Sequence, residues 1–321
     1  MFYNVYFRKI FLIFIVCCEI SLQGGVLTKP TFVQLGNSDF SVSLRLNSAT
    51  SNILEKSRFD RTGRVQQIIS SGKKWLVGDG LVDEFGISGK EGTLGYEDAS
   101  SEKPEFLKFG IGILARDEAP YSFEKNYPIV KMFPVSLTQV SKEECIIQQK
   151  GSFRQWNYLY RKHYKVYPFQ KKLQIVYEIQ NLGPATLTLE QYNHNYFAAP
   201  QGKWDQNTCI RTNFQLQGWQ KHWIIVHDRE IRLRHSVSGK LYYSCDIFQP
   251  QEHFLPHQVE LFWEGQLYWI LIGDQPAKRF ALFANNKALC PEIFVRLQIL
   301  PGKTKQWRRI YLLADNLNRE I

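Results

Sequence analysis

Two ionisable side chains, His194 and Glu292, lie in segments whose apolar and polar residues alternate. Alternation with a period of two is typical of a half-buried β-strand, because successive side chains point to opposite faces of the sheet. In residues 186–194 the leucines are expected on the core face, and the opposite face carries Thr188, Glu190, Tyr192 and His194. In residues 292–299 the aliphatic residues are expected on the core face, and the opposite face carries Glu292, Phe294, Arg296 and Gln298.

These residue types suit acid–base chemistry on a sugar. A carboxylate and an imidazole can exchange protons near neutral pH, since histidine titrates at about 6.5. Aromatic side chains between polar ones can cover the apolar faces of a sugar ring while donors and acceptors bind its hydroxyl groups. Without further information, His194 could equally be a packed structural histidine, and Glu292 could be a surface carboxylate paired with Arg296.

The segment Tyr192-Asn193-His194-Asn195-Tyr196-Phe197 resembles the Asn-His-x-Tyr-Phe motif of the galactose mutarotase-like (aldose 1-epimerase) superfamily. The segment 289–292, with Pro301-Gly302 nine residues later, is similar to the region of that superfamily that holds its catalytic glutamate. Residues 59–64, Phe-Asp-Arg-Thr-Gly-Arg, resemble the N-terminal turn of uncharacterised members. The resemblance covers roughly residues 38–315.

This resemblance implies a large antiparallel β-sandwich whose concave face binds a sugar or polysaccharide. It implies that Glu292 is the base that takes the proton of the C1 hydroxyl, and that His194 is the acid that protonates the ring oxygen. It also places Tyr192, Asn193 and Tyr196 at the substrate. We expect the two catalytic groups to line one cavity roughly 5–10 Å apart, as carboxylate pairs that flank a sugar do. The reaction requires no metal, nucleotide or redox cofactor.

One element of the resemblance is missing. Active mutarotases usually carry a second histidine in a His-Gly element on an earlier strand, where this chain has Lys108-Phe109-Gly110 and, downstream, Arg116. Lys108 and Arg116 are therefore candidate substrate-binding residues, and His163 is a candidate replacement for the missing histidine. A lysine is a different partner from a histidine, because its usual pKa is about 10.4.

Three functions remain open on this basis. The first is an isomerase of the aldose epimerase type that uses His194 and Glu292. The second is a non-catalytic carbohydrate-binding protein on the same fold, which the missing His-Gly element favours. The third is a lyase or hydrolase that acts on an acidic polysaccharide, for which Tyr192, Lys108 and Arg116 are the candidate groups.

The sequence predicts that the elements that position these candidate site residues are strands joined by turns. Alternating segments are Phe40–Leu46, Leu173–Ile179, Leu187–Leu189, Val259–Trp263 and Ile293–Ile299. Turn signals separate them, for example Ser71-Gly72, Ser238-Gly239 and Pro301-Gly302. Residues 79–105 are rich in glycine and acids and are expected to form long loops. No segment after residue 25 predicts an amphipathic helix longer than about ten residues, so the expected fold class is all-β, a large antiparallel sandwich.

Residues 1–25 differ in kind from the rest. Arg8 and Lys9 precede nine apolar residues, 10–18, a run of the length of a signal-peptide core and too short for a membrane span. We expect an export signal or an N-terminal membrane anchor, a single domain over residues 26–321, and an exported protein. Four cysteines follow, Cys145, Cys209, Cys245 and Cys290, which could form one or two disulfides in an oxidising compartment.

The formal net charge of +10 would attract anionic ligands. The cations are spread along the chain, however, and no nucleic-acid-binding module is present in the sequence. Nucleic acid is therefore not an expected partner, and no membrane contact is expected beyond the N-terminus.

Overall fold

The computed structural model describes residues 31–46, 56–97, 102, 104–216, 222–247 and 256–314. The predicted leader, residues 1–25, lies outside this range. Within it, the only helical element is a short 3₁₀ turn, η1 (Pro168–Gln170), and the other elements are strands. No helix in these residues is long and apolar enough to cross a membrane. The predicted all-β antiparallel fold is therefore confirmed.

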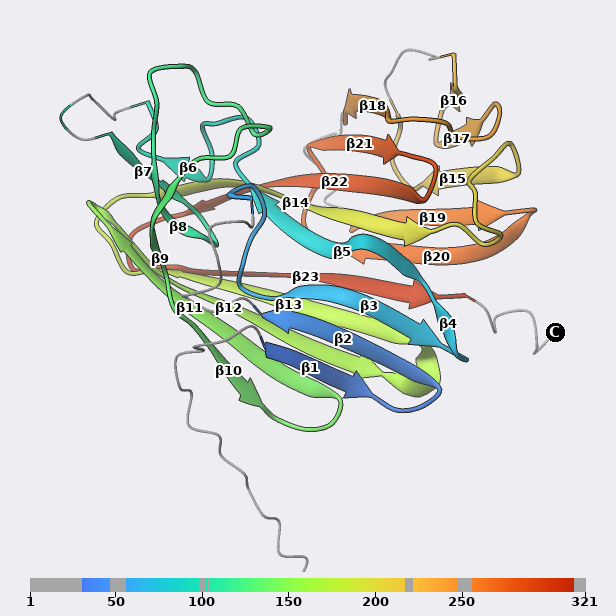
Figure 1. The fold of residues 1–321 in the computed structure, drawn as a ribbon, viewed down its shortest axis with the longest axis horizontal. Coiled ribbons are helices and arrows are strands. Elements are labelled where there is room, and N and C mark those ends of the chain that lie inside the picture. The colour runs from blue at the N-terminus through green and yellow to red at the C-terminus, as the bar shows by residue number, and fades with distance from the viewer. Residues whose placement is uncertain are drawn as a thin grey trace, which may run out of the picture.

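A nine-stranded antiparallel sheet carries the candidate site (Figure 1). Its main order is β1 (Thr31–Gly36), β2 (Phe40–Leu46), β3 (Arg64–Ser70), β5 (Leu76–Phe85), β14 (Leu187–Ala198), β22 (Ala288–Ile299), β21 (Arg279–Ala284) and β18 (Leu241–Asp246). The short β4 (Lys73–Lys74) pairs with β3 off this path. Strands from both ends of the chain thus meet at β5, β14 and β22.

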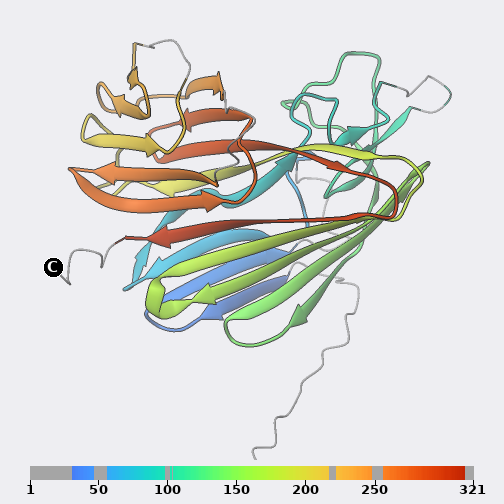
Figure 2. The ribbon, with the colours of Figure 1, turned by 180° about the vertical axis from the view of Figure 1, so that it is seen from behind.

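A second antiparallel sheet of ten strands lies behind the first in Figure 1 and in front of it in Figure 2. Its order is β10 (Val135–Gln139), β11 (Glu144–Phe153), β12 (Trp156–Tyr167), β13 (Lys172–Asn181), β23 (Thr304–Leu313), β20 (Gln266–Gly273), β19 (His257–Trp263), β15 (Thr208–Thr212), β17 (Glu230–Leu233) and β16 (Ile224–His227). A small four-stranded sheet lies at one end: β6 (Thr93–Leu94), β7 (Glu105–Lys108), β8 (Gly112–Ala115) and β9 (Ile129–Met132).

The main hydrophobic core lies between the two large sheets, where alternate residues of the strands are buried. In β2 the residues Val42, Leu44 and Leu46 are fully buried, and the polar residues between them are more exposed. The same alternation runs through β13 and β19. Burial of one face is the reason that the period-two pattern of the sequence predicted these strands correctly.

The prediction of long loops over residues 79–105 was wrong for its first part, because residues 79–85 belong to β5. This strand contains Asp83 and Glu84, which are buried to 3% and 0% exposure. Acidic residues are rarely buried unless they are paired, and here Lys162 pairs with Asp83 and Arg58 pairs with Glu84. The partners come from distant parts of the chain, so local sequence could not indicate this strand.

None of the four cysteines of the described residues is in a disulfide. All four side chains are buried. Burial raises the pKa of the Cys145 thiol to about 12 and that of the Cys209 thiol to about 11, which keeps both protonated at neutral pH.

Candidate functional site

His194 and Glu292 lie on neighbouring strands of the nine-stranded sheet, β14 and β22. The register pairs Gln191 with Val295 on one side and Phe197 with Leu289 on the other, and this register places His194 opposite Glu292. Both strands are longer than predicted, so the two residues lie within strands and not near their ends.

The two side chains are in direct contact. His194 Nδ1 and Glu292 Oε1 are 2.8 Å apart, although their relative orientation does not meet hydrogen-bond geometry. The expected separation of roughly 5–10 Å is therefore wrong for this structure. Both residues line the same cleft, as predicted, with residue exposures of 5% and 3%. Among the described residues, His194 Nε2 and Glu292 Oε2 have no polar partner, so these atoms remain for a ligand.

The strand pairing is irregular at this point. Between Gln191 and Phe197 the ladder to β22 is interrupted, and the facing segment contains Pro291, which has no N–H to donate. The amide of Asn195 compensates in part, since it donates to the carbonyl oxygen of Pro291 at 2.6 Å. Its own oxygen accepts from the Tyr311 hydroxyl at 3.0 Å. On its other side, β14 shifts register against β5 between Asn195 and Phe197, an irregularity of the bulge type that is common next to active sites.

Aromatic rings hold the imidazole of His194 on three sides. Tyr196 stacks on it with 4.4 Å between ring centroids. Phe283 and Phe59 contact it edge-on, at 5.3 Å and 5.8 Å. These contacts restrict the ring to one orientation, and they give the cleft apolar surfaces beside an acid–base pair. Both features suit a sugar ligand.

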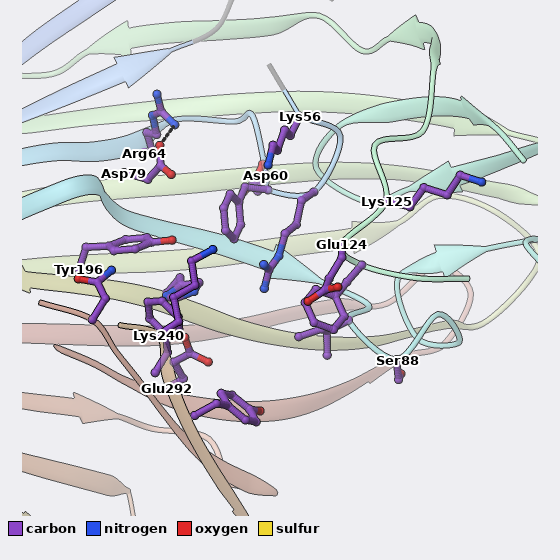
Figure 3. A pocket seen from close by; sticks show the side chains of 18 of the residues that line it. Lys56, Asp60, Arg64, Asp79, Ser88, Glu124, Lys125, Tyr196, Lys240 and Glu292 are labelled. Atoms are coloured by element: carbon purple, nitrogen blue, oxygen red, sulfur yellow. Dashed lines mark hydrogen bonds and ion pairs between the residues drawn. The ribbon is translucent and has the colours of Figure 1, made fainter. Parts of the chain in front are cut away.

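The cleft itself has a volume of ≈ 1190 Å³ and lies on the outer face of the nine-stranded sheet. Figure 3 shows it with Glu292 and Tyr196 on one side and the Arg64–Asp79 pair farther along the wall. Its lining comes from β2, β3, β5, β14, β18, β21 and β22, from loop residues within 56–61, 87–88 and 123–125, and from Lys240 and Asn285. The cleft exceeds the roughly 300–1,000 Å³ that ordinary small-molecule sites occupy.

Of the predicted substrate-binding residues of the motif, only Tyr196 lines the cleft. Tyr192 is fully buried, where it stacks on Phe294 and contacts Glu84 through its hydroxyl. Asn193 points into the sandwich, where its amide donates to Asp83 Oδ1 at 2.5 Å. Because side chains alternate along a strand, Asn193 must face away from its neighbour His194. The structure thus places Asn193 in the core and away from the cleft.

Lys108, Arg116 and His163 do not line the cleft. Lys108 is buried in β7, where its Nζ donates to the carbonyl oxygen of Phe85 at 2.6 Å and to the Tyr121 hydroxyl at 2.8 Å. Arg116 lies over the ring of Tyr96. His163 is on the outer face of the other sheet, in contact with Glu144. The expectation that one of them reaches the cavity of Glu292 is not met.

Arg58, which the sequence did not single out, brings a cation to the cleft. Its Nε donates to Glu84 Oε2 at 2.8 Å, and its Nη2 donates to the Tyr192 hydroxyl at 2.9 Å. The guanidinium group lies over the rings of Phe59 and Phe123. Burial alone would lower the pKa of Arg58, but Tyr192 and Glu84 raise it above its usual value. Arg58 is therefore a fixed positive charge at the cleft wall.

A buried charge cluster anchors the loop that carries Arg58. Lys162 Nζ lies 2.5 Å from Asp60 Oδ2 and 2.7 Å from Asp83 Oδ2, and its side chain is fully buried. The other oxygen of Asp60 accepts from the backbone and the hydroxyl of Thr62. The lysine on β12 thus joins the second sheet to the cleft loop and to β5.

Four further residues that the sequence pattern did not single out line the cleft: Arg45, Arg64, Lys240 and Tyr242. For Arg45 a signal existed, because the alternation of residues 40–46 places it on the face opposite to the leucines. For Lys240 and Tyr242 no local signal existed. Their segment is at the far edge of the sheet, and only the fold brings it to the site.

The similarity of this chain to known proteins is found in its fold and not in its sequence. No model of a known protein family matches the chain, and no curated protein matches it. Solved structures do match, among them a galactose mutarotase related enzyme from Lactobacillus acidophilus, with 12% identity, a TM-score of 0.51, and coverage of 88% of this chain and 97% of that one.

Two further structures agree. A galactose mutarotase-like protein from Lactobacillus casei has 11% identity and a TM-score of 0.51, with 88% and 100% of the two chains covered. A GalM/aldose epimerase homologue from C. elegans has 11% identity and a TM-score of 0.52, with 88% and 98% covered. The chain therefore has the galactose mutarotase-like fold, which the sequence resemblance predicted.

Proposed function

We propose that the protein binds a sugar in the cleft and interconverts its anomers, as an isomerase of the aldose epimerase type. The proposal rests on one observation above all. An imidazole and a carboxylate, His194 and Glu292, meet on the floor of an open cleft, and each has one polar atom left for a ligand. The fold supports the proposal, since the structures that share it include a galactose mutarotase related enzyme.

The proposed reaction opens and closes the hemiacetal ring. Glu292 takes the proton of the C1 hydroxyl, the bond between C1 and the ring oxygen breaks, and His194 delivers a proton to that oxygen. The C1–C2 bond then rotates, and the same two groups act in reverse as the ring closes on the other face of C1. No atom is gained or lost, so the residues of the chain suffice for this step.

The contact between the two groups has a consequence for this mechanism. His194 Nδ1 and Glu292 Oε1 lie 2.8 Å apart and face each other, so a reacting sugar would meet the other polar atom of each group. A sugar bound at His194 Nε2 and Glu292 Oε2 would receive a proton at one atom and lose one at another, and ring closure by the reverse steps would restore both protonation states.

Anomer exchange measured by NMR tests the proposal. A panel of aldoses is mixed with the protein, and the exchange rate between α and β resonances is compared with the spontaneous rate in buffer. Glu292→Gln should lower the protein-dependent rate by about 10²–10⁴-fold, the usual contribution of general acid–base catalysis. Glu190→Gln is the matched control, because Glu190 lies on the same strand as His194 but outside the cleft lining. It should keep the rate.

Non-catalytic sugar binding is the second candidate, and the close contact of His194 and Glu292 favours it, since groups that flank a sugar ring would stand farther apart. Exchange at the buffer rate for every sugar that binds would leave only this candidate. The lyase alternative lacks its predicted groups at the cleft, because Tyr192, Lys108 and Arg116 do not line it.

A further inference from the structure

The cleft is much longer than one sugar ring. Its lining includes residues of β2 at one end and of β18 at the other, and these two strands are six spacings apart in the order of the nine-stranded sheet. Neighbouring strands lie about 4.7–4.9 Å apart, so the cleft follows the sheet over roughly 28–29 Å. His194 and Glu292 lie on β14 and β22, between the two ends. A monosaccharide at this pair would leave both ends of the cleft unfilled.

The β18 end of the cleft presents an aromatic ring. Tyr242 lines the cleft and is 50% exposed. The register pairs it with Phe283, and the ring of Phe283 contacts the imidazole of His194 edge-on at 5.3 Å. Since β18 is two spacings from β22, Tyr242 lies roughly 9–10 Å across the sheet from the strand of Glu292. Aromatic surface therefore continues from the acid–base pair to a second position in the cleft.

Among the five aromatic residues of the described lining, only Tyr242 is exposed. The other four are half-buried: Phe59, Phe123, Tyr196 and Phe283. Tyr196 stacks on His194, and the guanidinium group of Arg58 lies over both Phe59 and Phe123. Tyr242 is therefore the ring best placed to stack on the apolar face of a second sugar unit.

Polar groups lie beside this ring. Lys240 and Asn285 adjoin the paired ends of β18 and β21, and both line the cleft. Asn285 Oδ1 accepts from the backbone N–H groups of Lys287 and Ala288, both at 2.8 Å, which fixes the orientation of the amide. In the part of the chain that the structure describes, the Asn285 amide nitrogen has no partner, so its two N–H donors remain for a ligand. Lys240 is exposed, and Figure 3 shows it among the side chains of the cleft.

We propose that Tyr242, Lys240 and Asn285 form a second sugar subsite, so that the ligand of this cleft is an oligosaccharide bound by its reducing end. The inference deepens the proposed function and rests on it. The reducing unit lies at His194 and Glu292, and the next unit stacks on Tyr242 and accepts hydrogen bonds from the two polar side chains. A unit linked at the 4-hydroxyl, across the ring from C1, leaves the hemiacetal free to react.

Calorimetric titration of the whole protein compares glucose with maltose, cellobiose and lactose, each of which has glucose as its reducing unit. We expect at least one disaccharide to bind at least about tenfold more tightly than glucose. Tyr242→Ala should lose about 3- to 10-fold of the affinity for that disaccharide and leave glucose binding unchanged. Phe169→Ala is the control and should change neither, because Phe169 is a 99% exposed aromatic residue outside the cleft lining.

Two further measurements separate a binding role from a structural one. Asn285→Asp keeps the oxygen that accepts from the two backbone N–H groups and removes both donors, so it should weaken binding of the disaccharide and not of glucose. The same disaccharide reduced at C1 to its alditol keeps the second unit and loses the hemiacetal, and it should bind more weakly than the parent sugar. If no disaccharide binds more tightly than glucose, or if both variants keep the preference, the subsite proposal is refuted.

Anomer exchange of the reducing unit, measured on the same samples, separates this proposal from the one on which it rests. A disaccharide that binds through Tyr242 but exchanges only at the buffer rate would refute the isomerase and support the subsite. Glucose exchanged equally well by wild type and Tyr242→Ala, with no preference for any disaccharide, would support the isomerase and refute the subsite.

Discussion

Replacement of Lys162 by methionine should destabilise the protein strongly at neutral pH. The ammonium group lies 2.5 Å and 2.7 Å from two buried carboxylates, and no solvent reaches it. Removing one partner of a buried ion pair typically costs about 3–5 kcal/mol, because the remaining charge stays buried and uncompensated. Methionine preserves most of the side-chain volume, so the loss of charge dominates the loss of packing.

The dependence of this loss on pH distinguishes charge from packing. Burial raises the pKa of Asp60 even in the wild type, where Lys162 opposes the shift, and the variant removes that opposition. A carboxyl group whose pKa is raised by folding binds more protons in the folded state than in the unfolded state. Such a carboxyl group therefore lowers the free energy of unfolding as the pH rises above about 3.9, which is its pKa in the unfolded state.

Equilibrium urea unfolding, followed by tryptophan fluorescence, measures this effect. The free-energy difference between wild type and Lys162→Met should shrink by up to about 1.4 kcal/mol for each pH unit between pH 7 and pH 5. Lys165→Met is the control, since Lys165 is an exposed lysine of the same strand, and it should show little change. A difference of less than about 1 kcal/mol at pH 7, or one independent of pH, would refute this account of the cluster.

Two further predictions concern stability. Burial lowers the pKa of Lys108 to about 8, so above that pH the unfolded state binds more protons than the folded state. The free energy of unfolding of wild type, relative to that of Lys108→Met, should therefore rise between pH 8 and pH 9.5. Urea unfolding measures this difference, and a difference that stays constant with pH would contradict the prediction. Gly80→Ala should cost about 1–3 kcal/mol or more, because Gly80 has a φ of +77° and an added Cβ would lie 2.0 Å from the carbonyl oxygen of Val65. Gly72→Ala has a similar φ of +75° with no atom within 4 Å, so a thermal melt should show a smaller loss for it.

Much of the fold could be predicted from the sequence because burial of one strand face leaves a local pattern. Residues 40–46 were predicted as a strand, and β2 has these bounds. The same pattern placed His194 and Glu292 on the faces that line the cleft. It also contained the information that Asn193 faces the other way, which the motif resemblance did not convey.

The remaining features depend on contacts between distant segments. The strand β5 exists with its acids buried because Lys162 and Arg58 neutralise them, and these residues are 26 or more positions away in sequence. The 2.8 Å contact of His194 and Glu292 depends on the pairing of β14 with β22, and no spacing along the chain encodes that register.

The sequence by itself determined which side chains are able to do the chemistry and which face of each strand they occupy, because alternation is a property of neighbouring residues. The tertiary structure decided which of these side chains meet. It excluded His163, Lys108 and Arg116 from the cleft and brought Arg45 and Arg64 together on its wall. Strand pairing depends on contacts between distant segments, because the favoured pairing minimises buried, unpaired charge and exposed apolar surface over the whole chain. The sequence of one local segment does not contain that information.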